Sequence, residues 1–173
     1  MSIPARKASM GHVAPTPGDG AVSGRPLAKL SLPGKPQSVA VARREVRKAL
    51  ADAGHDDAED AVLLLSEMVS NAVLHTRSRH AGGRVLVEVF EIDVGLVRLE
   101  VTDEGAQGVP HVSRPDCDRT DGRGLWLLDE LGKGWGFRRN GECGCTWVEV
   151  MTRTECVRAA SRTDLCTRDW PSP

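Results

Sequence analysis

The 173-residue sequence is poor in aromatic side chains and has no excess of charge of either sign. Phe, Trp and Tyr together make up 3% of the residues, and Tyr is absent. Few rings are therefore available to stack on nucleic-acid bases. The chain has 23 Lys and Arg against 24 Asp and Glu, a formal net charge of -1. This balance gives no electrostatic reason to expect binding to nucleic acid or to an anionic membrane.

The sequence also lacks a long apolar run and an even set of cysteines. Its longest clean apolar stretch is residues 61–65, whereas a membrane-spanning helix needs about 20 such residues. No continuous apolar stretch that could form a signal peptide occurs in the first thirty residues. Five cysteines argue against a closed disulfide framework, and Cys143 and Cys145 lack a second pair at zinc-ligand spacing. We therefore expect a soluble, cytoplasmic protein with reduced thiols.

The distribution of Pro, Gly and polar residues predicts one folded domain with two loose ends. Residues 1–26 are rich in Pro, Gly, Ala and Ser and have no hydrophobic period, which is typical of a disordered arm. Residues 153–173 turn polar again and are expected to form a loose tail. The folded domain is predicted over residues 27–152, a length that can bury a sizeable core.

Hydrophobic periodicity within that domain predicts an α+β fold. Strands are expected at residues 27–32, 84–92, 96–102, 134–139 and 146–151. Helices are expected at residues 36–53, from a cap at Asp56 or Asp57 to about His75, and at residues 124–131. Paired hairpin strands with helices grouped between them predict a two-layer α/β sandwich. Its mixed, mainly antiparallel sheet should be covered on one face by three helices.

The second of these helices is apolar nearly all round, but it carries Glu67 and Asn71. These two residues are four apart and therefore lie on one side of the helix. A carboxylate on such a helix is costly unless it faces a cleft or a partner. One interpretation is a solvent-facing edge or a hydrogen-bonded pair. The other is a cleft in which Glu67 is a general base and Asn71 offers its amide oxygen to Mg²⁺.

Asp103 and Gly105 follow directly on an expected strand. They can form an ordinary strand-ending turn, which both residue types favour. Alternatively, the carboxylate of Asp103 accepts a hydrogen bond from an exocyclic amine, and Gly105 lets a ligand lie close to the backbone.

The segment Gly122-Arg123-Gly124-Leu125 opens the third expected helix after a long loop. It can be a simple hinge and helix start. It can also be a phosphate cradle, because the glycines let the backbone approach an anion and free N–H groups at the helix start point toward it. Arg123 would then add positive charge.

The order and spacing of these motifs resemble the ATP-binding fold of the gyrase, histidine-kinase and MutL superfamily, over about residues 28–151. The motifs that carry the resemblance are Glu67-x-x-x-Asn71, Asp103-x-Gly105, Gly122-x-Gly124 and Gly144-x-Thr146. Within this histidine-kinase-like ATPase fold, residues 65–73, 103–105 and 122–125 look like the stand-alone anti-sigma-factor serine kinases.

The resemblance implies a role for each residue of the adenine and metal sites. Glu67 would be the base that activates a hydroxyl group or water, and Asn71 would hold Mg²⁺. Asp103 would bind the adenine amine, and Gly105 would lie beneath the base. Thr146 would assist the adenine site through its hydroxyl group or a water molecule.

The same resemblance implies a phosphate site. The loop over residues 106–121 would be the lid over the phosphates of ATP. Gly122, Arg123 and Gly124 would contact those phosphates through backbone and charge, with Leu125 completing the motif. The lid is short and contains Pro110 and Pro115.

Two functions are compatible with these residues. The first is a Mg-ATP-dependent protein serine/threonine kinase that acts on an anti-sigma antagonist. The second is a non-catalytic binding module, gated by the nucleotide, that sequesters a sigma factor or another regulator. The presence of both Glu67 and Asn71 favours the kinase. The resemblance also implies that the protein can form a homodimer.

Overall fold

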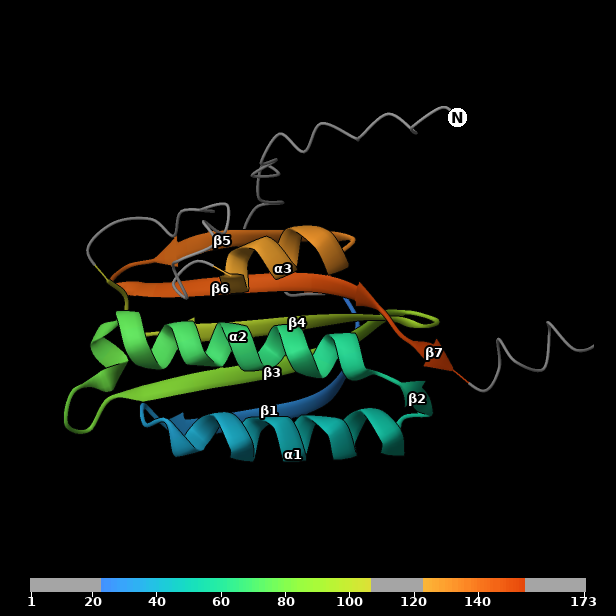
Figure 1. Cartoon of the computed structure of the whole chain (residues 1–173), viewed down its shortest axis with the longest axis horizontal. Helices are drawn as coiled ribbons and strands as arrows, with labels where there is room; N and C mark the ends of the chain where they lie inside the picture. The colour runs from blue at the N-terminus through green and yellow to red at the C-terminus, as the bar shows by residue number, and fades with distance from the viewer. Residues whose placement is uncertain (1–22, 107–122, 155–173) are drawn as a thin grey trace, which may run out of the picture.

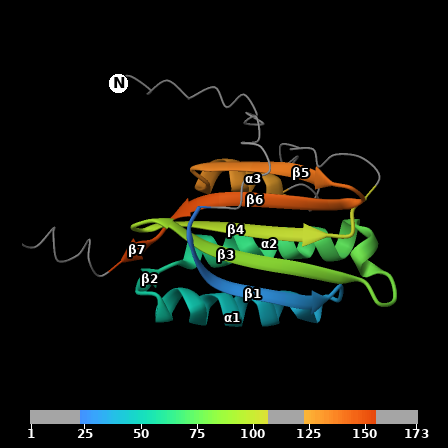
Figure 2. The same cartoon turned by 180° about the vertical axis from the view of Figure 1, so that it is seen from behind.

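The computed structural model describes residues 23–106 and 123–154. These residues form two layers, an antiparallel sheet and a layer of helices that covers one of its faces (Figure 1). Figure 2 shows the same molecule from behind, with the strands in front of the helices. The five-stranded sheet has the order β1-β3-β4-β6-β5. All of its pairings are antiparallel, and the predicted α+β sandwich with three helices on one face is confirmed.

All the strands and helices expected from periodicity are present, with ends shifted by a few residues. The strands of the sheet are β1 (Arg25–Pro33), β3 (Arg84–Asp93), β4 (Leu96–Asp103), β5 (Gly134–Asn140) and β6 (Cys143–Met151). The helices are α1 (Gln37–Asp52), α2 (Glu59–His75) and α3 (Arg123–Leu131). Three shorter elements were not expected, namely β2 (His55–Asp57), the 3₁₀ helix η1 (Arg77–Arg79) and β7 (Arg153–Thr154).

Two of the expected loose segments contribute to strands at their inner ends. β1 begins at Arg25, within the arm predicted over residues 1–26. Pro26 is tolerated there because β1 is an edge strand, where a missing N–H group breaks no ladder on the open side. β7 lies at the start of the tail predicted over residues 153–173, and it pairs with the distant β2. Residues 1–22 of the arm and residues 155–173 of the tail lie outside the described residues.

The three helices bury their apolar sides against the sheet and against each other. In α1, Ala42, Val46 and Leu50 recur every four residues and are fully buried, which forms one apolar stripe. α2 lies between α1 and α3 and packs on β3, β4 and β6, so most of its circumference is buried (Figure 1). None of the helices in the described ranges combines the length and the hydropathy that crossing a bilayer requires.

Alternating side chains of the sheet complete the core. The core-facing residues of the neighbouring inner strands β3 and β4 are nearly or fully buried, and they are Val85, Val87, Val89, Val97, Leu99 and Val101. Burial of each such side chain contributes about 1.5–3 kcal/mol to folding. Since successive side chains of a strand point to opposite faces, the residues between them lie on the face away from the helices.

That second face of the sheet carries a buried charge cluster. Glu100 is only 2% exposed, and its carboxylate accepts hydrogen bonds from Arg98 at 2.8 Å and from Arg138 at 2.6 Å. The Arg98 guanidinium also lies 4.0 Å from the centre of the Trp147 ring, a favourable cation–π contact. Two arginines thus compensate the burial of one carboxylate, and the aromatic ring stabilises one of these arginines.

Leu99→Ala should lower the free energy of unfolding by about 2–5 kcal/mol, because it leaves a cavity on the middle strand of the sheet. Chemical denaturation measures this change. Val94→Ala in the adjoining turn is the matched control, since Val94 is 64% exposed. It should change the stability by less than about 0.5 kcal/mol. Equal effects of the two substitutions would contradict the assignment of β4 to the core.

Candidate functional site

The corner where β4 ends holds a fixed carboxylate. Asp103 is the last residue of β4 and is 7% exposed. Its Oδ1 atom accepts a hydrogen bond from the backbone N–H of Gly105 at 2.6 Å. The backbone N–H of Gly144, which lies opposite on β6, donates to the same carboxylate. Two backbone donors from two segments of the chain therefore set the position of this side chain.

The pKa of Asp103 is raised above the ordinary value of an aspartate, mainly because burial disfavours the charged form. The hydrogen bonds from Gly105 and Gly144 and the positive charge of Arg139 oppose this rise, whereas Glu104 adds to it. The charged carboxylate thus stands in a poorly hydrated corner, where a hydrogen-bond donor of a ligand would be bound strongly.

Glycines allow the backbones at this corner to lie close together. Gly105 has a φ of +78°, and a Cβ atom there would overlap the carbonyl oxygen of Glu142. A Cβ atom on Gly144 would lie 2.9 Å from the ring of Phe137 on β5. Neither position has room for a side chain, so the close approach of these segments requires glycine at both.

Thr146 lies next to this corner. It is half-buried on β6, two residues beyond Gly144, and it pairs with Val101 of β4. Alternation along both strands puts Thr146 and Asp103 on the same, helix-covered face of the sheet. The structure therefore brings together three predicted site residues, Asp103, Gly105 and Thr146.

Arg77 is a residue of this corner that the sequence analysis missed. Its backbone N–H donates to the carbonyl of Gly105 at 2.9 Å. Its guanidinium donates to the carbonyl oxygens of Glu104 at 2.9 Å and Glu142 at 3.2 Å. Arg77 thus connects the end of α2 to the turns after β4 and before β6. No periodicity or motif marks a lone arginine of this kind, because all three carbonyls are backbone groups.

Arg139 was also missed. Its guanidinium donates to the carbonyl oxygen of Ala106 at 3.3 Å, and its charge acts on Asp103. In the sequence it is one of two adjacent arginines near the end of an expected strand, and only the pairing of β5 with β6 brings it to the corner.

Glu67 and Asn71 lie on α2, in the layer that covers this face of the sheet. Both are half-buried, and they are separated by one helical turn. Neither side chain forms a hydrogen bond or an ion pair with any residue in the described part of the chain. His75, the exposed last residue of the helix, precedes Arg77 by two positions. The stripe of α2 that carries Glu67 and Asn71 thus leads toward the Asp103 corner with its polar groups available.

The donor atoms available to a metal ion here are oxygens. Across residues 23–106 and 123–154, no group of three or more His, Cys, Asp and Glu could hold a metal ion. Cys143 and Cys145 are both free thiols. The amide oxygen of Asn71 is a single hard donor, which fits a Mg²⁺ ion that keeps several waters and takes its other ligands from phosphate groups.

The motif predicted to contact phosphates lies at the edge of the described residues. Arg123, Gly124 and Leu125 form the first turn of α3, so the predicted helix start is found one residue early. α3 packs against α2, which carries Glu67 and Asn71. Gly122 and residues 107–121 of the expected lid lie outside the described residues, as do the side chains of Arg123 and Leu125.

Comparisons with known proteins show the family of the chain. Residues 32–150 match the family described as "Histidine kinase-like ATPase domain", and the chain belongs to this family. It is 33% identical over 105 residues to the anti-sigma F factor of Clostridium botulinum strain Eklund 17B, a match that covers 55% of this chain and 72% of the relative. The anti-sigma F factor of strain Alaska E43 matches equally well.

A solved structure has a similar fold. The RsbU and RsbW domains of Rv1364c from Mycobacterium tuberculosis align with a TM-score of 0.55 at 22% identity, over 72% of this chain. The aligned part makes up 32% of that longer chain, so this protein spans about a third of it. At this identity the likeness supports the fold and carries no residue roles.

Asp103→Asn should change how stability depends on pH. Because the raised pKa belongs to the folded state, the protonated form of Asp103 stabilises the fold below the ordinary value of 3.8. That contribution is lost as the pH rises through the raised pKa. The asparagine side chain keeps an oxygen for the two backbone donors but does not ionise. The variant should therefore gain stability relative to the parent between pH 3.8 and neutrality.

Denaturation of both proteins across this pH range measures the difference. A stability difference that stays constant with pH would contradict the burial of an ionised Asp103. Asp60→Asn at the exposed start of α2 is the control for the loss of one surface carboxylate.

Proposed function

We propose that this chain is an ATP-binding regulatory protein of the anti-sigma-factor type, and that it acts as a Mg-ATP-dependent protein serine/threonine kinase on an anti-sigma antagonist. The observation that carries the proposal is the arrangement of the corner at Asp103 beside a helix whose Glu67 and Asn71 have no protein partner within the described residues. The match to anti-sigma F factors supports the choice of partner.

The Asp103 corner suits the adenine base. A buried, ionised carboxylate accepts a hydrogen bond from the exocyclic amino group of adenine. It cannot donate a hydrogen bond to the carbonyl oxygen that guanine has at the same position. Gly105, which turns the chain directly after Asp103 at a φ of +78°, would lie beneath the base. The half-buried hydroxyl group of Thr146 offers one further polar contact on the same face of the sheet.

The phosphates of the nucleotide would extend from this corner toward α2 and the start of α3. Gly122, Arg123 and Gly124 would contact them through backbone N–H groups and positive charge, next to Leu125. Asn71 would be the protein ligand of Mg²⁺. When bound, this ion neutralises phosphate charge during phosphoryl transfer.

Glu67 is the proposed general base. It would accept the proton of a serine hydroxyl group while the hydroxyl oxygen forms a bond to the γ-phosphorus atom and the bond to ADP breaks. The half-exposed position of Glu67 on α2 leaves room for a side chain of another protein.

A specific observation favours a second function, the nucleotide-gated module that sequesters a sigma factor or another regulator. Within the described residues, no side chain holds Glu67 in place, whereas catalytic bases usually have an orienting partner. In that case the nucleotide would only set the shape of the protein. A homodimer stays a prediction for either function.

Calorimetric titration with ATP and Mg²⁺ tests the nucleotide site. The parent should bind, and Asp103→Asn should weaken binding by at least about tenfold, because the amide presents donors to the adenine amine. Asp60→Asn should leave the affinity unchanged. An unchanged affinity in Asp103→Asn, or no binding by the folded parent, would contradict the proposed site.

Glu67→Gln separates the two functions. Glutamine keeps the size of the side chain but accepts no proton, so ATP affinity should stay within about threefold of the parent. Phosphate transfer from labelled ATP to a purified anti-sigma antagonist should fall by at least about 10². A parent that binds ATP but labels no antagonist would contradict the kinase and leave the binding module.

A further inference from the structure

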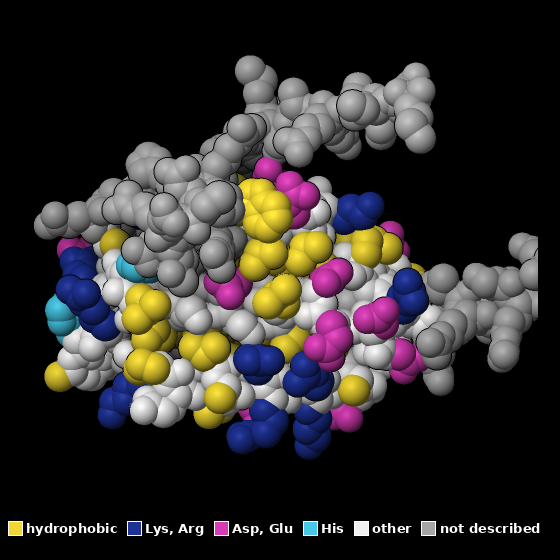
Figure 3. Space-filling view, viewed as in Figure 1, with side chains coloured by type: hydrophobic (Ala, Val, Ile, Leu, Met, Phe, Trp, Pro, Cys, Tyr) yellow, Lys and Arg dark blue, Asp and Glu magenta, His cyan; other side chains and the backbone are white. Residues whose placement is uncertain are grey.

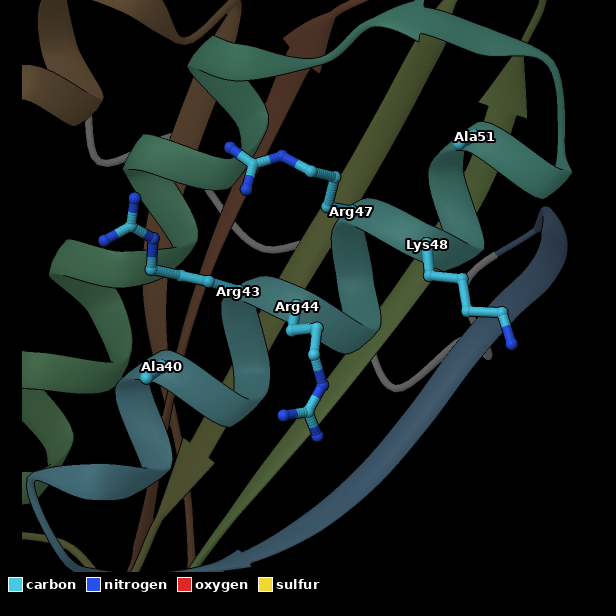
Figure 4. Close-up of a pocket in the computed structure, with 6 residues that line it drawn as sticks. All are labelled: Ala40, Arg43, Arg44, Arg47, Lys48 and Ala51. Carbon is cyan, nitrogen blue, oxygen red and sulfur yellow. The ribbon is translucent and has the colours of Figure 1, made fainter.

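The outward side of α1 forms a groove of basic side chains, which we call the basic groove. It is lined by Ala40, Arg43, Arg44, Arg47, Lys48 and Ala51 (Figure 4). In Figure 4, the side chains of Arg43 and Arg47 extend toward α2, and those of Arg44 and Lys48 extend away from it. Four positive charges therefore stand on about one and a half turns of helix, in a chain whose formal net charge is -1.

These charges are only weakly engaged within the protein. Arg44 pairs with its neighbour Glu45 at 2.7 Å, and Arg47 pairs with Glu59 of α2 at 2.9 Å. Both members of each ion pair are more than a third exposed. Such surface pairs contribute about 0–1 kcal/mol to stability. Arg43 and Lys48 make no ion pair with the described residues. An incoming carboxylate thus displaces little.

The shape of the basic groove suits a helix lying along α1. Ala40 and Ala51 stand at its two ends, and their small side chains let another backbone come close. The stretch between them is about 17 Å long at the rise of an α-helix, or three turns. Between the alanines, the basic residues recur at spacings of four, so a facing helix can place carboxylates at the same spacing. The aliphatic stems of the arginines add apolar contact area.

The border of the groove favours a protein over a phosphate backbone or a membrane surface. Figure 3 shows the dark blue side chains over α1 next to a group of magenta acidic side chains. Glu59 and Asp60 begin the neighbouring helix α2, and Asp52 ends α1 itself. A phosphate track or lipid surface is uniformly negative and would be repelled by this acidic border. A protein can match a narrow positive strip with carboxylates and the border with its own cations.

We propose that the basic groove of α1 is a docking surface for an acidic α-helix of a partner protein. This inference rests on the proposed function in one respect, namely that a regulatory protein has a protein partner. α1 belongs to the same helical layer as α2 (Figure 1), so a partner held there stands next to the helix that carries Glu67. Docking itself needs no nucleotide.

A synthetic helix tests the surface directly. The probe is a fluorescent, staple-constrained, alanine-rich peptide of about 18 residues, with glutamates four residues apart, added to the full chain. Fluorescence anisotropy should show saturable binding that weakens as salt is added. The same peptide with glutamine in place of glutamate should bind at least about tenfold more weakly.

Charge reversal in the groove gives the matched comparison. Arg43→Glu with Lys48→Glu should weaken peptide binding by at least about tenfold, and circular dichroism should show an intact fold. Arg79→Glu with Lys133→Glu is the control, because both residues are exposed and lie outside the groove. It makes the same change of net charge and should alter the affinity by less than about twofold. Equal losses in the two double variants would overturn the proposal.

Two further titrations separate this proposal from its alternatives. A single-stranded oligonucleotide or phosphatidylglycerol vesicles that bind more tightly than the peptide, and lose binding in the groove variant, would overturn the choice of a protein partner. ATP affinity of the groove variant should equal that of the parent. If the parent fails to bind ATP but binds the peptide through the groove, the proposed function fails and the docking surface stands.

Discussion

The burial of α2 against the middle of the sheet is the contact on which the other features of the molecule depend. Leu64, Leu65 and Val69 of this helix are fully buried, and α2 packs on both of the other helices as well as on β3, β4 and β6. Loss of this packing would expose the core faces of the whole helical layer. The packing of α2 also sets the rotation of this helix about its axis. That rotation determines the direction in which the stripe with Glu67 and Asn71 faces.

The register of β4 against β6 places the rest of the candidate site. Leu99 faces Val148 and Val97 faces Val150 across the two strands, all on the core side. A slip of one residue would turn these side chains to the other face of the sheet, which is a large cost in buried apolar area. The core fixes this register, and the register in turn places Asp103 opposite Gly144, on the face of the sheet that the helices cover.

The parts of this architecture that follow a period or a motif could be predicted from the sequence, and those that depend on pairing between distant segments could not. Alternating Val and Leu predict β3 and β4, and Asp103 and Gly105 stand where a strand must end. Arg77 was not predicted because its partners, backbone carbonyls and the Glu142 carboxylate, belong to residues remote in sequence. β7 was not predicted because two residues are too few to show a hydrophobic period. It is a strand because it pairs with the distant β2. The alternation along β4 predicts that Glu100 points away from the helices. The alternation does not predict that this carboxylate is nearly buried.

The basic groove and the Asp103 corner are joined by one rigid element. Glu59 at the start of α2 bonds to Arg47 of the groove, and Arg77, just beyond the other end, holds the turn at Gly105. Between them α2 runs for 17 residues without a glycine or a proline, so it has no built-in hinge. Coupling between two sites needs an element with two arrangements that both sites bias, and an uninterrupted packed helix does not supply one. Through the described residues, partner docking and nucleotide binding should therefore contribute nearly additive free energies.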